Sequence, residues 1–165
     1  MENSYFLDIS KLVAYEITKQ DFNVSLDFDF TDGDAVISTP ISFIGTISNN
    51  SSYISLNGTV RATFSARCSR CLKDITKTLS LPLSSPIATE PLSEENDEYI
   101  FAENGTVDLY EVAYSLIVLN MPTKYLCSDD CKGLCTRCGK DLNLGPCGCK
   151  KDIDPRLSGL SDFFK

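Results

Sequence analysis

Cysteine is the residue type of this sequence best suited to chemistry, and it occurs eight times in a chain without histidine. Two cysteines form the pair Cys68-x-x-Cys71, and the other six follow as Cys127-x3-Cys131-x3-Cys135-x2-Cys138-x8-Cys147-x-Cys149. Closely spaced thiolates are typical ligands of structural zinc, which takes four soft ligands in a tetrahedron. The spacing therefore predicts a metal-binding protein whose ligands are all thiolates.

Eight thiols divide naturally into two sites of four, and we predict two zinc ions. The compact set holds the four cysteines nearest the C-terminus, which are Cys135, Cys138, Cys147 and Cys149. The other set is Cys68, Cys71, Cys127 and Cys131. A metal in this second set would close a long loop and stabilise the fold. Buried free thiols, disulfides in an oxidising compartment and an iron–sulfur cluster are the alternatives.

The rest of the sequence gives little support to catalysis. Without histidine there is no Ser-His-Asp or Cys-His nucleophile, and catalytic zinc needs an open coordination position. The aspartate pairs Asp129–Asp130 and Asp152–Asp154 are typical of helix caps and solvated loops. We therefore expect a protein that is not an enzyme and has no small-molecule substrate.

Charge is distributed unevenly along the chain. The formal net charge of −8 argues against binding nucleic acid through bulk electrostatics. However, residues 61–80 carry five basic side chains against one acidic, whereas residues 81–111 carry eight acidic and none basic. Five cations near the cysteines are candidates for contact with RNA or a protein partner, namely Arg67, Arg70, Lys73, Arg137 and Lys140. The alternative is that these cations neutralise thiolates and face solvent.

The sequence also bears on location. The N-terminus lacks the basic start and apolar run of a targeting segment, and the longest apolar run, Leu116–Leu119, is too short to span a bilayer. We expect a cytoplasmic protein without membrane contact, whose thiols are kept reduced.

Alternating polarity predicts strands in the first half of the chain. Residues 22–30 alternate, shorter pieces at 35–38 and 41–47 are separated by Pro40, and the alternation at 54–68 resumes after Cys71. Gly58 is a candidate position for a bulge. The last two runs predict a long antiparallel hairpin with the Cys68–Cys71 pair at its tip.

The second half of the chain is predicted to contain a loop, helices and a cysteine-rich segment in place of strands. Residues 89–105 form an acidic loop or linker, and 106–122 hold a helix capped by Asp108 or Thr106 that ends near Asn120 because of Pro122. Its apolar face would be Leu109, Val112, Leu116 and Leu119. Residues 123–165 form a cysteine-rich segment with a short final helix after Asp154-Pro155. The expected fold is α+β: an antiparallel sheet or partly open barrel over residues 1–88, covered by the helix and followed by zinc knuckles.

Several segments together resemble one known family. In order, they are Cys68-Ser-Arg-Cys-Leu72, Leu119-Asn-Met-Pro122, Cys127-x3-Cys131-Lys-Gly-Leu-Cys-x-x-Cys-Gly-Lys-Asp-Leu-Asn143, Cys147-Gly-Cys149 and Asp154-Pro-Arg-Leu157. This series closely resembles the YceD family of large ribosomal RNA subunit accumulation proteins. The resemblance implies a bacterial cytoplasmic protein, with plastid relatives, that is needed for accumulation or processing of large-subunit ribosomal RNA and is not an enzyme. It also implies large-subunit ribosomal RNA or ribosomal proteins as partners.

A second resemblance supplies the alternative function. Cys135-x-x-Cys138 with Cys147-x-Cys149 is similar to the zinc site of redox-regulated holdase chaperones, in which oxidation releases zinc and exposes apolar surface. The two motifs occur here in the reverse order, and the rest of the chain does not match. A zinc-dependent thiol switch is thus the alternative to a ribosomal RNA factor.

Overall fold

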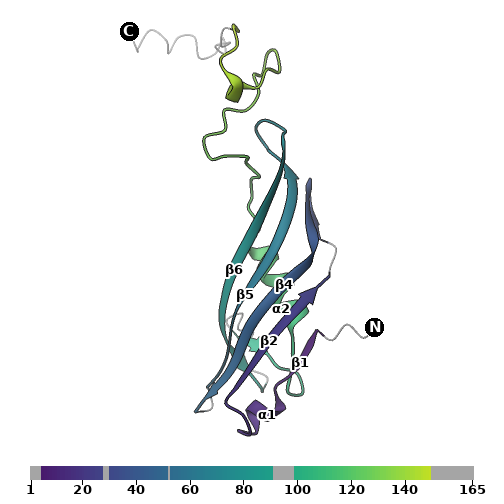
Figure 1. The fold of residues 1–165 in the computed structure, drawn as a ribbon, viewed down its shortest axis with the longest axis vertical. Coiled ribbons are helices and arrows are strands. Elements are labelled where there is room, and N and C mark those ends of the chain that lie inside the picture. The colour runs from purple at the N-terminus through teal and green to yellow at the C-terminus, as the bar shows by residue number, and fades with distance from the viewer. Residues whose placement is uncertain (1–4, 28–29, 52, 91–98, 150–165) are drawn as a thin grey trace.

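The computed structural model describes residues 5–27, 30–51, 53–90 and 99–149 (Figure 1). The helix predicted after Asp154 lies outside the described residues. The elements in chain order are β1 (Phe6–Asp8), α1 (Ser10–Val13), β2 (Lys19–Leu26), β3 (Thr31–Asp32), β4 (Ala35–Asn50), β5 (Tyr53–Arg67), β6 (Asp74–Ala88), β7 (Ile100–Phe101), β8 (Thr106–Asp108), α2 (Leu109–Asn120) and the 3-10 turn η1 (Leu142–Leu144).

A long twisted sheet dominates the fold, in the strand order β2-β4-β5-β6-β7 with β3 added beside β4 (Figure 1). Its pairings are antiparallel except for the parallel contact of β6 with β7. The sheet is open, since its end strands β2 and β7 do not pair with each other. The α+β class is confirmed, and the sheet rather than the barrel is the form found.

The predicted hairpin is the longest regular feature of the sheet. β5 and β6 pair continuously from Ser55↔Pro86 to Arg67↔Asp74, so the Cys68–Cys71 turn lies at the tip. One face of β5 is buried, including Leu56, Val60 and Phe64. Burying each such side chain contributes about 1.5–3 kcal/mol, so the alternation seen in the sequence fixes which face meets the core.

Three details of the sheet differ from the prediction. The strand predicted over residues 22–30 is β2, which runs from Lys19 to Leu26. β4 runs through Pro40 as one strand, because a register shift between Ser38 and Ser42 accommodates the residue that cannot donate to a ladder. The bulge at Gly58 is wrong, since Gly58 pairs in regular register with Gly45 and Leu83. A Cβ at Gly58 would lie 3.0 Å from the Phe43 ring, so glycine makes room for that aromatic side chain.

Helix α2 covers one face of the sheet (Figure 1). Its N-cap is Asp108, whose Oδ1 accepts hydrogen bonds from the N–H groups of Tyr110 at 2.9 Å and Glu111 at 3.2 Å. The helix ends at Asn120, two residues before Pro122, as predicted. Its buried residues are Leu109, Ala113 and Ile117.

The burial of α2 corrects the predicted apolar face. Leu109 is buried, but Val112 and Leu116 are half-buried and Leu119 is 82% exposed. Val112 and Leu116 still pack against the core beside the buried Leu109, Ala113 and Ile117, so Leu119 is the predicted residue that lies outside this contact. No helix in the described part of the chain is long and apolar enough to cross a membrane.

Candidate metal centre

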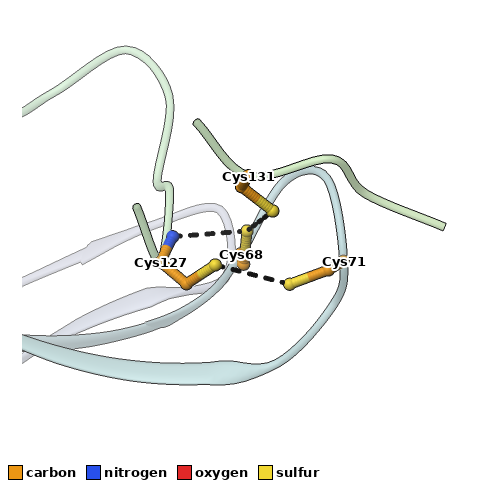
Figure 2. Close-up of side chains that lie close together, drawn as sticks. All are labelled: Cys68, Cys71, Cys127 and Cys131. Carbon is orange, nitrogen blue, oxygen red and sulfur yellow. Dashed lines mark hydrogen bonds between the residues drawn. The ribbon is translucent and has the colours of Figure 1, made fainter. Parts of the chain in front are cut away.

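The first cysteine group joins the hairpin tip to the chain that follows α2. Its members are Cys68, Cys71, Cys127 and Cys131, and their sulfur atoms all lie within 4.8 Å of one another (Figure 2). The Sγ atoms of Cys68 and Cys131 are 3.9 Å apart, and those of Cys71 and Cys127 are 3.6 Å apart. These separations exceed the S–S bond of about 2.05 Å and suit four ligands around one ion.

An aromatic contact and a backbone bond bring the two halves of this group together. The ring of Tyr125, just before Cys127, lies 5.4 Å from the ring of Phe64 on β5. The Tyr125 carbonyl accepts a hydrogen bond from Ser69 N–H at 2.7 Å. The chain leaving α2 is thus fastened along the hairpin before it supplies its thiols.

The second group contains the other cysteines, Cys135, Cys138, Cys147 and Cys149, and its sulfurs also lie within 4.8 Å of one another. An antiparallel bridge between Leu134 and Asp141 closes the base of its first turn. Cys138 is exposed and the other three are half-buried, whereas three of the four thiols in the first group are buried. The structure thus brings the eight cysteines together in the two sets that their spacing predicts.

Both Cys-x-x-Cys pairs form the same backbone turn. Cys68 N–H donates to the Lys73 carbonyl at 2.8 Å, and Leu72 N–H donates back to the Cys68 carbonyl at 2.9 Å. Cys135 N–H likewise donates to the Lys140 carbonyl, and Gly139 N–H to the Cys135 carbonyl, each at 2.8 Å. The residue after the second cysteine has positive φ in both turns, +59° at Leu72 and +71° at Gly139.

Backbone N–H groups in these turns favour thiolates. Burial opposes ionisation of Cys68, but the N–H groups of Cys71, Arg70 and Cys127 outweigh it and lower its pKa to about 6. The Cys127 N–H lies 3.4 Å from the Cys68 sulfur (Figure 2). The Lys73 N–H lowers the pKa of Cys71, but burial and the neighbouring thiols raise it to about 12. A cation at the centre would therefore be needed to ionise all four.

The second group shows the same division. The N–H groups of Cys138 and Arg137, followed by the Cys147 thiol, lower the pKa of Cys135 to about 6. The Cys138 thiol, together with burial and the other thiols, raises the pKa of Cys149 to about 12. Each group thus holds a readily formed thiolate beside a thiol that resists ionisation in the absence of a cation.

The five candidate contact cations surround these groups, and most are tied to the chain itself. Arg70 Nη1 donates to the Cys131 carbonyl at 2.8 Å, and Lys73 Nζ lies 2.8 Å from Asp141 Oδ2. Lys140 Nζ donates to the Pro146 carbonyl at 3.0 Å. The exposed Arg67 is 3.7 Å from Asp34, and the exposed Arg137 contributes the N–H that faces Cys135. The side chains of Arg70, Lys73 and Lys140 therefore have a structural role in the turns that hold the cysteines.

Asn143 and Asp141 join the two groups, and the sequence analysis missed both. Asn143 Nδ2 lies 3.5 Å from the Cys131 sulfur, and its Oδ1 accepts from Lys132 N–H at 2.8 Å. Burial opposes ionisation of Cys131, but Gly133 N–H and the Asn143 amide together lower its pKa. The only available signal was the position of both residues between the ligand pairs of the second group.

The donor set fits a soft four-coordinate cation such as zinc. Each group offers four sulfurs, no carboxylate among the described residues belongs to either group, and the sequence contains no histidine. Four protein ligands complete a tetrahedron, which is typical of a structural rather than a catalytic zinc site. N–H groups directed at sulfur, like those on Cys68 and Cys131, orient such ligands.

Comparisons with known proteins place the chain in a described family. The family described as large ribosomal RNA subunit accumulation protein YceD matches residues 56–164, which is more than half of the chain. An uncharacterized protein of Mycobacterium leprae is 28% identical over 129 residues, covering 76% of this chain and 59% of that protein. An uncharacterized protein of Mycobacterium tuberculosis is 29% identical over 113 residues, covering 66% and 55%.

A plant protein is also similar. The large ribosomal RNA subunit accumulation protein YCED homolog 1, chloroplastic, of Zea mays is 24% identical over 159 residues, covering 77% of this chain and 54% of that protein. The chain thus spans little more than half the length of the curated relatives it matches. No solved structure matches it.

Proposed function

The chain belongs to the YceD family, and from this premise we propose that it supports accumulation of large-subunit ribosomal RNA as a non-enzymatic factor with two structural zinc ions. The name shared by the family and the maize relative supports the ribosomal RNA role. Bacterial relatives and that role together support action in the cytoplasm.

The observation that carries the zinc proposal is the assembly of eight thiols into two groups with all sulfurs within 4.8 Å. Cys68, Cys71, Cys127 and Cys131 would hold one ion, and Cys135, Cys138, Cys147 and Cys149 the other. Bound zinc would neutralise thiolate charge and cross-link segments that already meet through hydrogen bonds such as that from Ser69 N–H to the Tyr125 carbonyl. The first site would fix the chain after α2 to the hairpin tip.

The closed ligand sets support a non-enzymatic role. Four thiolates leave no coordination position for substrate, and the sequence has no histidine to act as a base beside the metal. We place contact with ribosomal RNA or ribosomal proteins at the end of the molecule that holds both cysteine groups. Arg67, Arg70, Lys73, Arg137 and Lys140 lie there and are the proposed contact residues.

Complementation tests this role. Cells lacking the chain should show a lower ratio of large-subunit to small-subunit ribosomal RNA, and the intact protein should restore it. Cys68→Ser should restore it poorly, whereas Ser69→Ala, an exposed change in the same turn, should restore it fully. An unchanged ratio in the deletion strain would count against the ribosomal role, and full restoration by Cys68→Ser against the need for the metal.

A further inference from the structure

A groove of about 860 Å³ lies between α2 and the C-terminal end of β6, away from both cysteine groups. Residues of β1, β6, β7, β8 and α2 line it. The helix contributes Val112 and Leu116, which are half-buried at the edge of the core, and the exposed Leu119. The groove is therefore built from regular elements on an apolar base.

Large apolar side chains collect in this groove without being covered. Leu119 is 82% exposed, Phe6 62%, Phe101 49% and Tyr99 42%. Three of the four are aromatic. Phe6 begins β1, Tyr99 directly precedes β7, Phe101 ends β7 and Leu119 lies in the last turn of α2. Scattered exposed apolar residues are ordinary, but several around one hollow mark a site that another molecule covers.

The charge of the groove is of one sign. Glu103, Asp108 and Glu111 line it, and no lysine or arginine does so among the described residues. Carboxylates bind ammonium and guanidinium groups directly, and nearby aromatic faces add cation–π attraction. Carboxylates beside exposed apolar side chains favour a ligand whose cation has an apolar stem or apolar neighbours.

We propose that this groove binds a basic, amphipathic segment of a partner protein, in which lysine or arginine accompanies apolar side chains. The apolar side chains would lie on Val112, Leu116 and Leu119, and the cations would meet Glu103 and Glu111. Nucleic acid is the poorer fit, because its phosphates would face three carboxylates with no lining cation to release counterions. None of the eight cysteines lines this surface.

Fluorescence anisotropy with a labelled peptide of alternating arginine and leucine tests the proposal on the full zinc-loaded chain. We expect saturable binding, and Leu119→Ser and Glu111→Gln should each raise the dissociation constant about tenfold. Leu144→Ser is the matched control, since Leu144 is 78% exposed but does not line the groove. Both groove positions are exposed, so thermal melting should show that their variants remain folded.

Other results would overturn the proposal that the groove binds a basic, amphipathic segment. Equal binding of a peptide with serine in place of leucine would reduce the effect to charge alone, and equal binding of one with glutamate in place of arginine would remove the charge argument. An unaltered dissociation constant for Leu119→Ser would exclude the groove. A dimer in sedimentation that Leu119→Ser dissociates would make the occupant a second copy. If a short RNA binds, is displaced by the peptide and binds more weakly to Leu119→Ser, the occupant of the groove would be nucleic acid.

Discussion

Asn143 Nδ2 lies 3.5 Å from the sulfur of Cys131, so a residue between the ligand pairs of one cysteine group contacts a ligand of the other. The Lys73–Asp141 ion pair of 2.8 Å makes a second link between the two turns. Metal in one group would therefore hold these bridging residues in the geometry that the other group uses.

Replacing Asn143 should weaken the first site. Asn143→Ala removes the amide that faces Cys131 and the oxygen that accepts from Lys132 N–H. Loss of such an outer contact typically lowers metal affinity 10–100-fold, and we expect about tenfold. Competition with a chromophoric zinc chelator measures this change. Asn120→Ala is the control, because Asn120 is exposed and donates to the Leu116 carbonyl within α2. Equal zinc affinity in the two variants would show that the Asn143 contact with Cys131 does not support the first site.

Metal content should report the two-site partition directly. Native mass spectrometry of the reduced protein should show two zinc ions, falling to one in Cys68→Ser and to one in Cys138→Ser, because these cysteines belong to different groups. The double variant should bind none. Two ions lost in either single variant would indicate one shared cluster, and no metal in the intact protein under zinc-sufficient conditions would refute both sites.

The second site should lose its metal first. Cys138 is exposed and its partners are half-buried, whereas Cys68, Cys71 and Cys131 are buried, so oxidants and chelators reach the second group more easily. Mild peroxide should release one equivalent of zinc with little change in circular dichroism, since the main sheet does not include that group. Reversible release with a large loss of secondary structure would instead favour the thiol switch.

The hairpin could be predicted from the sequence because alternation and Cys-x-x-Cys spacing are local patterns, and the cysteine partition because the compact set of four leaves four others. Alternation fixes the buried face of β5, and Cys-x-x-Cys spacing fixes a turn. The face of α2 could not be predicted, because Val112, Leu116 and Leu119 are as apolar as Ala113 and Ile117. Which stripe is buried depends on the sheet that the helix meets. The contact of Asn143 could not be predicted, because no sequence pattern marks an asparagine whose amide lies near a cysteine sulfur.

Gly58 shows the same limit. An alanine there would place its Cβ 2.8 Å from the Ile44 carbonyl oxygen and 3.0 Å from the Phe43 ring. Both groups are held by the sheet, so Gly58→Ala should destabilise the protein by about 1–3 kcal/mol. Urea unfolding measures the change. Gly148→Ala is the control, because a Cβ there has nothing within 4 Å. Equal midpoints for the two variants would contradict the packing account.

Leu72 offers the opposite test, a substitution that should stabilise. Leu72 has a φ of +59° and so adopts the left-handed conformation directly after the Cys68-x-x-Cys71 turn. Gly139 holds the same position after the Cys135-x-x-Cys138 turn. A β-carbon in that conformation costs about 1 kcal/mol, and Leu72 is 60% exposed, so its side chain returns little packing energy.

Leu72→Gly should therefore raise the melting temperature of the zinc-loaded protein, and Gly139→Ala should lower it. Glycine also gives the unfolded chain greater freedom, which reduces this gain. We therefore expect the free energy of unfolding to rise by less than about 1 kcal/mol. Calorimetry at fixed zinc concentration, with metal content checked in each variant, separates backbone strain from altered binding. A lower melting temperature for Leu72→Gly would mean that the exposed leucine side chain contributes more by packing than its backbone conformation costs.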